Sequence, residues 1–364
     1  MGNQIAGSFG VFTVRIALDV MGGDHAPAAI LDGGLTAAEV LADDDQLVLI
    51  GDEELIREGL REASLHNDAR FVVEATDQVI EMGDSPVTAL RAKPNSSIVR
   101  MGWLGSEKKA KEKHCQAIIS AGNTGACVAA AQMSMRRLPG VHRPGIAIVL
   151  PTFHGPVVVC DVGANPEPKA SHLYQYSIMA GVYAEKVLGI DNPKVGVMNI
   201  GGEEGKGTPL VKETSKLCRE DETLNYAGNV EGRELCNGKA NGVVTEGFTG
   251  NVVLKLAEGL SAGIFQTITR EAMEIDMVLA MRFEPVVKSI YKKHDYHEYG
   301  GAPLLGANGL CMICHGSSEA RTITNAIKKA KMNHDLKVND ALIEALAAHE
   351  GGGSSEERRV GKKI

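Results

Sequence analysis

Short apolar runs of strand length alternate along this chain with longer segments in which apolar residues recur at helical spacing. The runs are "VRIALDV", "QLVLI", "ARFVV", "CQAII", "GIAIVL", "PVVVC", "KVGVMNI", "NGVV" and "GLCMIC". Strands that alternate with helices form βαβ units, in which a mostly parallel sheet is covered by helices on both faces. The sequence therefore predicts an α/β fold.

The composition fits a large globular protein of this class. The chain has 364 residues, which suits one large lobe or two closely joined lobes. Hydrophobic residues make up 44% and aromatic residues only 4%, so Val, Ile, Leu, Ala and Met must fill the core. A formal net charge of −8 argues against nucleic acid as a partner.

The sequence has no features of a secreted or membrane-spanning chain. No apolar run approaches the roughly 20 residues that cross a bilayer, and no stretch resembles a signal peptide. The seven cysteines are scattered and most stand in apolar runs, which indicates a reduced chain rather than a disulfide framework. The expected location is the cytoplasm.

We expect residues 1–13 to form a loose extension and residues 14–335 to form a single α/β catalytic domain. A helical excursion is expected at about 260–297, and a C-terminal helix with a disordered tail over 336–364. The stretch 272–299 mixes Met, Val and Phe with basic residues around a proline. Packing on a second subunit is the favoured explanation, because the apolar face is short; contact with a membrane is the alternative.

Polar, glycine-rich loops follow five of the predicted strands, where α/β folds bind ligands. The loop "NIGGEEGKGTPLVKET" resembles a P-loop, but its glycines have the wrong spacing from Lys206. Flexible backbone, free N–H groups at a helix start and one mobile cation still make a good anion site. Lys206 is therefore a candidate ligand of an anion.

Two further loops have similar chemistry. "SAGNTGA" places Gly122 and Gly125 around Asn123 and Thr124, and "GFTGN" contains Thr249, Gly250 and Asn251. Glycine lets backbone N–H groups approach an anion, and the side chains add neutral donors. Each loop alone could equally be a tight turn with a Thr or Asn helix cap. Together with the Lys206 loop, they favour a shared phosphate site.

Acidic side chains follow two other strands. "MGGDHAP" contains Gly22, Gly23, Asp24 and His25, and a carboxylate beside an imidazole could act in acid/base catalysis. The alternative is that Asp24 caps a helix with Pro27 in its first turn. "DVGAN" contains Asp161 and Asn165. Asp161 could bind a metal, a lysine or a helix terminus, and the sequence does not choose among these partners.

Several familiar motifs are rejected. "CMICH" matches a haem-attachment pattern, but the run has strand character and a zinc site would need a second ligand pair, so a buried strand is the better interpretation. His315 then leads into a helix that Ser317 or Ser318 can cap. No G-x-S-x-G elbow is found, and no G-x-G-x-x-G follows a strand. We expect neither a metal nor a cofactor.

At these loops the chain resembles the bacterial phosphate acyltransferase family, the acyl-ACP:phosphate transacylases called PlsX. The matching stretches occur in the family's order over about residues 14–330. They are "MGGDHAP", "SSI", "SAGNTGA", "RPG", "DVGAN", "HLYQYSIMAGVYAEKVLGI", "EEGKG", "NVEGR", "GFTGNVVLK", "YGGAPLLG" and "HGSS". Glu246 and Asn241 stand where the family usually has Asp, and Gly145 where it has Ala.

The resemblance implies transfer of a fatty acyl group from acyl carrier protein to inorganic phosphate for phospholipid synthesis. It implies a three-layer α/β/α sandwich like that of isopropylmalate dehydrogenase and phosphotransacetylase, without a cofactor, in a homodimer. Family members associate loosely with the inner face of the membrane and supply a membrane glycerol-phosphate acyltransferase.

Physical roles can then be assigned to the candidate residues. Lys206 supplies positive charge to the phosphate or the oxyanion, Asn251 donates to either, and His25 is a weaker candidate for proton transfer to the leaving thiolate. The phosphate and substrate site comprises Gly22, Gly23, Asp24, Gly122, Asn123, Thr124, Gly125, Asp161, Asn165, Thr249 and Gly250. The basic stretch "MRRLPGVHRPG", with Arg136, Arg137 and Arg143, is the expected docking patch for the acidic carrier protein, although a charged helix end is the more common explanation.

Three alternative functions stay open. A phosphotransacetylase-like enzyme would use the same loops with coenzyme A as its thiol partner. A nicotinamide-dependent decarboxylating dehydrogenase is less well supported, since the dinucleotide fingerprint is absent. A scaffold that binds lipid or carrier protein would bind without phosphate and would show no turnover.

Overall fold

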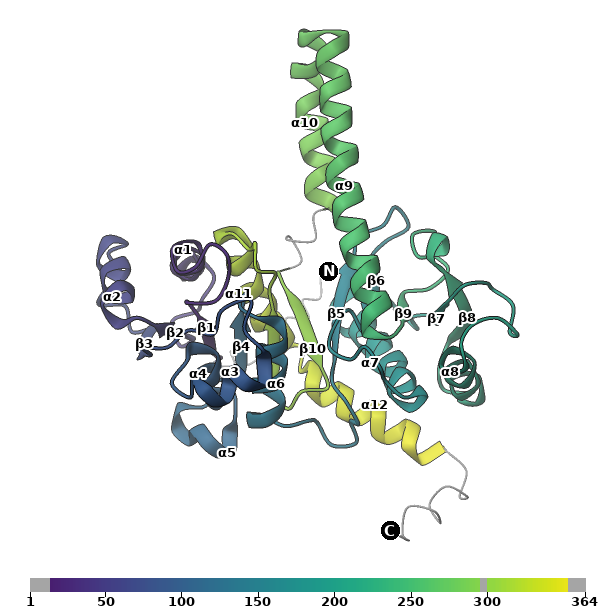
Figure 1. Ribbon diagram of the computed structural model, residues 1–364, viewed down its shortest axis with the longest axis horizontal. Helices are drawn as coiled ribbons and strands as arrows, with labels where there is room; N and C mark the ends of the chain where they lie inside the picture. The colour runs from purple at the N-terminus through teal and green to yellow at the C-terminus, as the bar shows by residue number, and fades with distance from the viewer. Residues whose placement is uncertain (1–13, 295–299, 353–364) are drawn as a thin grey trace, which may run out of the picture.

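The structure is a computed structural model that describes residues 14–294 and 300–352. The predicted extension over 1–13 and the tail from residue 353 onward lie outside the described residues. In the described part, helices and strands alternate as the sequence pattern predicts (Figure 1).

The described strands form one eleven-stranded sheet with the order β3-β2-β1-β4-β11-β10-β5-β6-β9-β7-β8. Strands of the first half are β1 (Arg15–Asp19), β2 (Gln46–Gly51), β3 (Phe71–Ala75), β4 (Ala117–Ser120) and β11 (Leu310–Ile313). The central strands are β10 (Ala302–Leu305) and β5 (Gly145–Leu150). Those of the second half are β6 (Val157–Cys160), β7 (Val195–Asn199), β8 (Tyr226–Glu231) and β9 (Gly242–Val244).

Strand direction divides the sheet into two halves. The five strands of the first half are mutually parallel, and so are the four of the second half. Between them, β10 is antiparallel to β11 and β5, and β5 is antiparallel to β6. The sheet is therefore mostly parallel, as predicted, but its halves point in opposite directions.

Most of the helices form two outer layers on the sheet. The helices are α1 (Ala28–Thr36), α2 (Glu53–Glu62), α3 (Pro86–Ala92), α4 (Ser97–Leu104), α5 (Glu107–Ala110), α6 (Thr124–Ser134), α7 (Ala170–Leu188), α8 (Pro209–Glu220), α9 (Gly247–Ile275), α10 (Met277–His294), α11 (Ala320–Asp335) and α12 (Val338–Gly352). Short 3-10 turns are η1 (Ala37–Glu39), η2 (Lys111–Lys113) and η3 (Gly232–Glu234). Together with the sheet, the layers form the predicted three-layer α/β/α sandwich.

Burial on both faces explains the continuous apolar runs of the strands. In β1, Ile16 and Leu18 pack with α1 and α11, whereas Ala17 packs on the opposite face with α4 and α6. In the second half, Val197 of β7 and Val244 of β9 pack against α7 and α12, which cover one face of the sheet. Successive strand residues therefore reach different helical layers, and each layer excludes water from its face.

The predicted excursion at 260–297 belongs to a longer pair of helices. α9 begins at Gly247 inside the sandwich and continues to Ile275, and α10 returns beside it, so that the pair projects from the body (Figure 1). Large apolar side chains are exposed on the pair; they include Leu256, Leu260, Ile264, Met273, Ile275, Met277, Val278 and Met281. No helix within residues 14–294 and 300–352 combines the length and the apolar character needed to span a bilayer.

Candidate active site

The loops after β1 and β4 lie against each other, and a buried carboxylate joins them. Asp19, the last residue of β1, is fully buried and accepts from the Ser120 hydroxyl at 2.7 Å and the Met21 N–H at 3.1 Å. Ser120 in turn accepts from the Gly122 N–H at 3.0 Å. Burial raises the pKa of the Asp19 carboxyl, and the bonds from Ser97 and Ser120 oppose this rise. Asp19 and Ser120 thus fix the start of both loops.

Glycine at position 22 is required by the close approach of these loops. A Cβ placed there would lie 2.5 Å from Oδ2 of Asp19 and 2.8 Å from Cα of Gly122. Any side chain would therefore have to push backbone aside. The first pair of predicted site loops does meet, and the absence of a side chain at Gly22 is what permits the contact.

Asn123 caps a helix and holds a neighbouring segment in place. Its Oδ1 accepts from the Ala126 N–H at 3.0 Å at the start of α6. Its Nδ2 donates to the carbonyl oxygens of Met82 and Asp84, both at 3.0 Å. The two amide hydrogens are thus already used. Thr124 is exposed, so its hydroxyl and the loop N–H groups are the donors that this loop presents to solvent.

The end of β11 completes what we call the first loop group, residues 22–25, 120–125 and 315–318. The Asp24 N–H donates to the Gly316 carbonyl at 2.7 Å, which joins "MGGDHAP" to "HGSS". Asp24 does not cap α1, because Pro27 occupies the cap position there without a side-chain bond. His25 and His315 are exposed, and Nδ1 of His315 lies 2.7 Å from the Ser317 hydroxyl.

A second loop group, residues 161–165, 199–208 and 245–251, gathers at the ends of β6, β7 and β9. Asp161 is fully buried. Its Oδ1 accepts from the N–H groups of Ile146, Gly163 and Ala164 at 3.0–3.1 Å, and its Oδ2 from the Asn165 N–H at 2.6 Å. Burial raises the pKa of Asp161, and these N–H donors oppose the rise. Its described partners are thus four backbone N–H groups and the Asn165 side-chain amide, which donates to Oδ2 at 3.2 Å.

The loop after β9 is seated directly on the loop after β6. The Gly247 N–H donates to the Asn165 carbonyl at 2.8 Å, and a Cβ on Gly250 would collide with the carbonyl oxygen of Asp161. The Asn165 amide donates to the Pro144 carbonyl at 2.7 Å, which attaches the group to the start of β5. Gly250 therefore serves close backbone packing in this structure.

Glu246 caps α9. Its carboxylate accepts from the N–H groups of Phe248 at 2.7 Å and Thr249 at 3.0 Å, and the Thr249 hydroxyl donates to it as well. The Glu246 carboxylate therefore satisfies N–H groups at the helix terminus. Asn251, in the first turn of α9, is half-buried.

The Lys206 loop lies beside the loop after β9, because β7 and β9 are neighbours in the sheet. The Asn199 amide donates to the Lys206 carbonyl at 3.2 Å, and the Asn229 amide donates to the Glu203 carbonyl at 3.1 Å. Thr208 caps α8. The side chain of Lys206 is exposed. The backbone of the loop is thus fixed, while its ammonium group is open to solvent.

The sequence favours a site shared by several of these loops, and the described contacts join the loops as two groups. Because β5 and β6 are antiparallel, the two halves of the sheet direct their carboxyl ends toward opposite edges. Helix α9 extends from one group to the other. It begins at Gly247 in the second group, and Glu258 lies near His315 of the first group: burial raises the pKa of the Glu258 carboxyl, and the charge of His315 lowers it. At 1.5 Å per residue, the stretch from Gly247 to Glu258 spans about 16 Å.

The predicted docking loop adjoins the second group through Pro144. Arg136, Arg137 and Arg143 are exposed and line a cavity of about 490 Å³. Gln175 of α7 holds the loop, since its Oε1 accepts from the His142 N–H and its Nε2 donates to the Gly140 carbonyl, each at 2.8 Å.

Positive charge extends from this loop toward α7. Burial and the charges of His142, Arg143, Lys169 and Arg137 lower the pKa of the His172 imidazole. The second loop group therefore has a positively charged neighbourhood on the side that faces the docking loop.

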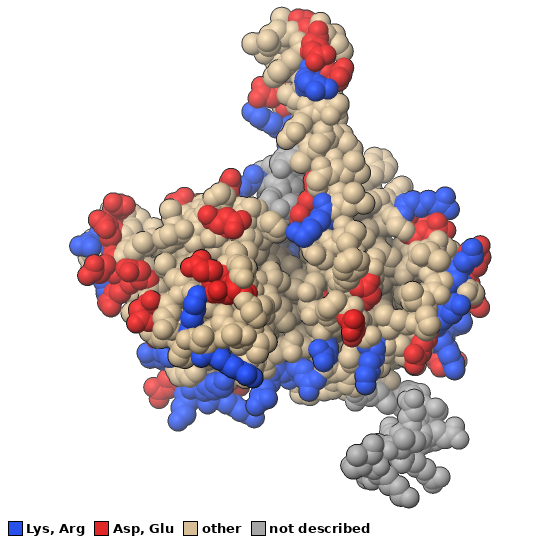
Figure 2. Space-filling model, viewed as in Figure 1, with Lys and Arg blue, Asp and Glu red and all other residues tan. Residues whose placement is uncertain are grey.

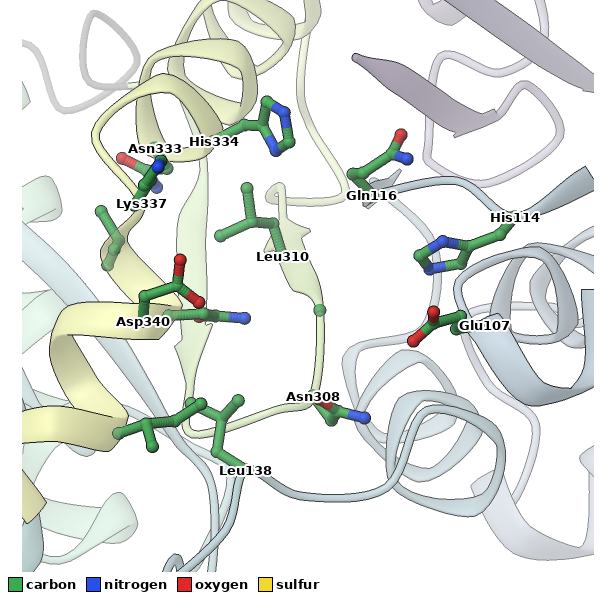
Figure 3. A pocket seen from close by; sticks show the side chains of 14 residues that line it. Glu107, His114, Gln116, Leu138, Asn308, Leu310, Asn333, His334, Lys337 and Asp340 are labelled. Atoms are coloured by element: carbon green, nitrogen blue, oxygen red, sulfur yellow. The ribbon is translucent and has the colours of Figure 1, made fainter. Parts of the chain in front are cut away.

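A different pocket, of about 300 Å³, opens at the other ends of β4 and β11 (Figure 3). Gln116 and Leu310 lie at its centre, His114 and Glu107 on one side, and Asp340 on the other (Figure 3). Because Gln116 precedes β4 whereas Gly122 follows it, the pocket lies at the opposite end of that strand from the first loop group. None of the predicted phosphate-site residues lines it.

The "CMIC" stretch is the buried strand β11, as predicted. Cys311 and Cys314 are both buried, and burial raises the pKa of each thiol to about 12. Within residues 14–294 and 300–352, no group of three His, Cys, Asp or Glu side chains is arranged to hold a metal ion.

Sequence reasoning missed Asp19 and Ser120, the buried pair that joins two loops. The available signal was a polar residue at the last position of each apolar strand, in "RIALD" and "AIIS". It also missed Glu258, which lies too far along α9 from the glycine motif to be noticed.

Known proteins resemble the chain in both sequence and fold. A family model described as "Fatty acid synthesis protein" matches residues 14–340. A phosphate acyltransferase of Desulfitobacterium hafniense is 46% identical over 321 residues, 87% of this chain and 93% of that protein. One of Heliobacterium modesticaldum is 44% identical over 338 residues, 92% of this chain and 97% of that protein.

The fold is that of the phosphotransacetylases. A phosphotransacetylase from Streptococcus pyogenes superposes with a TM-score of 0.57 at 15% identity, covering 91% of this chain and 94% of that one. A branched-chain phosphotransacylase from Enterococcus faecalis superposes at 0.52 with 12% identity, covering 88% and 98%. The glycine loops, the family match and the identity over most of both sequences lead to one conclusion: the chain belongs to the phosphate acyltransferase family.

Proposed function

We propose that the protein transfers a fatty acyl group from acyl carrier protein to inorganic phosphate and releases acyl phosphate. The family relatives support acyl transfer to phosphate. The observation that carries the proposal is the second loop group, where the exposed ammonium of Lys206 stands on a fixed loop beside the start of α9. A cation next to backbone N–H groups and neutral donors suits a phosphate dianion.

In this reaction phosphate itself is the nucleophile. One of its oxygens bonds to the thioester carbonyl carbon, the resulting oxyanion collapses, and the carbon–sulfur bond breaks to release the thiolate. Lys206 holds the phosphate or stabilises the oxyanion, and the Asn251 amide and loop N–H groups donate to either. Since the Thr249 hydroxyl already donates to Glu246, this residue contributes mainly by holding the loop.

The first loop group accommodates the rest of the thioester substrate in our proposal. The carboxyl group of Asp24 in this group and the neighbouring carboxyl groups of Asp19 and Glu258 disfavour a second dianion there. Thr124 and the glycine N–H groups can bind neutral polar atoms. His25 of the first loop group is exposed and is the candidate that gives a proton to the leaving thiolate. The thiolate needs little assistance, because thiol pKa values are modest.

The direct test mixes the protein with palmitoyl carrier protein and phosphate and detects acyl phosphate by mass spectrometry. A parallel reaction with palmitoyl-CoA tests the alternative, a phosphotransacetylase-like transfer between coenzyme A and phosphate, which the fold likeness favours. Acyl phosphate from the carrier-bound substrate supports the proposal. Product only from the CoA thioester selects the alternative, and no product from either removes both.

A Lys206→Ala variant tests the role of the cation. We expect turnover to fall about 100-fold or more, because removing one group that stabilises a developing oxyanion slows turnover by about that factor. Lys212→Ala, on the exposed side of α8, is the matched control and should stay active. Near-normal phosphate-dependent thioester cleavage by Lys206→Ala would remove Lys206 from the mechanism.

The projecting pair of helices suggests two further partners. We propose that the exposed apolar side chains of α9 and α10 pack on a second copy of the chain and that the helices also touch the membrane surface. Membrane contact would bring acyl phosphate to a membrane glycerol-phosphate acyltransferase. Light scattering of the purified protein and flotation with lipid vesicles measure the two contacts separately.

A further inference from the structure

A basic surface continues beyond the predicted docking loop onto α5. Residues 107–113, which cover α5 and η2, contain four lysines and two glutamates, and residues 134–143 contain three arginines and no acidic residue. Figure 2 shows Lys and Arg side chains gathered along the lower border of the molecule, where Figure 1 places α5. In a chain of net charge −8, this border has the opposite sign to the whole.

A direct contact joins the two segments. The Lys109 ammonium donates to the Ser134 hydroxyl at 3.1 Å, and Ser134, the last residue of α6, is two residues before Arg136. Lys108 and Lys111 are exposed next to Lys109. The basic surface is therefore continuous from α5 to the end of α6.

The same surface leads to the second loop group. Beyond Arg137 and His142, the Pro144 carbonyl accepts from Asn165, so the last residues of the docking loop contact the loop after β6. An acidic protein bound along this border would have its covalently attached acyl arm next to the proposed phosphate site. The cavity of about 490 Å³ among the arginines lies on the way.

We infer that the α5 lysines and the Arg136–Arg143 loop form one docking surface for acyl carrier protein, with Lys108 and Lys111 steering the partner at its far end. This inference rests on the proposed function for the identity of the partner. The charges lie at an exposed border, so they act on the encounter between the proteins more than on the chemical step. Their effect must therefore weaken with salt.

The test uses a Lys108→Glu/Lys111→Glu double variant of the full chain. Its control is Lys186→Glu/Lys212→Glu, which makes the same change of net charge at exposed positions on α7 and α8. Fluorescence anisotropy of labelled carrier protein gives the Kd, and kcat/KM is measured with palmitoyl carrier protein and with palmitoyl-CoA.

At about 50 mM ionic strength, we expect the α5 variant to bind the carrier about tenfold more weakly and to lose kcat/KM equally with the carrier-bound substrate. The loss should nearly disappear at about 0.5 M salt, and activity with palmitoyl-CoA should not change. An unchanged Kd, or an equal loss in the control variant, overturns the inference. If the wild type binds the carrier at this surface but makes no acyl phosphate from any thioester, the proposed function fails and the docking surface stands.

Discussion

Replacing Asp161 with asparagine should destabilise the second loop group. Four backbone N–H groups point at the two carboxylate oxygens, and the shortest bond runs from the Asn165 N–H to Oδ2 at 2.6 Å. Asparagine keeps one acceptor oxygen, which can still serve Ile146, Gly163 and Ala164. Its NH₂ group then faces both the Asn165 N–H and the Asn165 side-chain amide, so that buried donors lose their acceptor.

The size of the effect follows from these contacts. A buried donor left without an acceptor costs about 2 kcal/mol, and weaker bonding of the other three N–H groups to a neutral oxygen adds about 1–2 kcal/mol. Removing the buried charge offsets part of this loss of stability, because burial destabilises the charged carboxylate and raises the pKa of Asp161. We therefore expect the free energy of unfolding to fall by about 3 kcal/mol.

Urea unfolding followed by circular dichroism measures this loss. Asp24→Asn is the matched control, because Asp24 also follows a strand but has an exposed side chain. The control should change the free energy of unfolding by no more than about 0.5 kcal/mol. A loss below about 1 kcal/mol for Asp161→Asn would show that the carboxylate does not organise this loop as the hydrogen bonds indicate.

Three other predictions follow from single contacts. Gly22→Ala should cost about 2–3 kcal/mol by urea unfolding, because its Cβ would lie 2.5 Å from Asp19; an unchanged urea midpoint would contradict the close approach. Glu246→Ala should cost about 1–2 kcal/mol through loss of the α9 cap, whereas Glu246→Asp should be nearly neutral in the same assay; equal losses would refute the capping role. Because the pKa of His172 is lower in the folded protein than in the unfolded chain, its stability contribution is complete above about pH 6.5 and is lost as the pH falls below it. His172→Gln should reduce the drop in urea midpoint between pH 7.5 and 5.5. An identical drop in the variant and the wild type would show that folding does not lower the pKa of His172.

Much of the architecture could be predicted because strand and helix patterns are local. The run "VRIALDV" indicates β1, since consecutive apolar residues suit a strand buried on both faces. The predicted excursion at about 260–297 covers the later part of α9 and all of α10, whose exposed apolar and basic residues stand out in the sequence. The glycine loops were found because each follows a strand.

The roles of individual loop residues were harder to predict. Asn123 in "SAGNTGA" is equally suited to bind an anion or to cap a helix, and only the positions of Met82 and Asp84 show that its amide hydrogens are used. Asp161 was undetermined for the same reason, since its partners come from β5 and from its own loop. Such bonds depend on segments brought together by the fold.

The sequence by itself determined the α/β class, the family and the places where polar loops follow strands, because these depend on residue type and on spacing along the chain. Only the tertiary structure decided which loops meet, since the antiparallel pairing of β5 with β6 sends the two sets of carboxyl ends to different edges. Strand order and direction arise from long-range pairing and burial, and a local pattern contains no record of them.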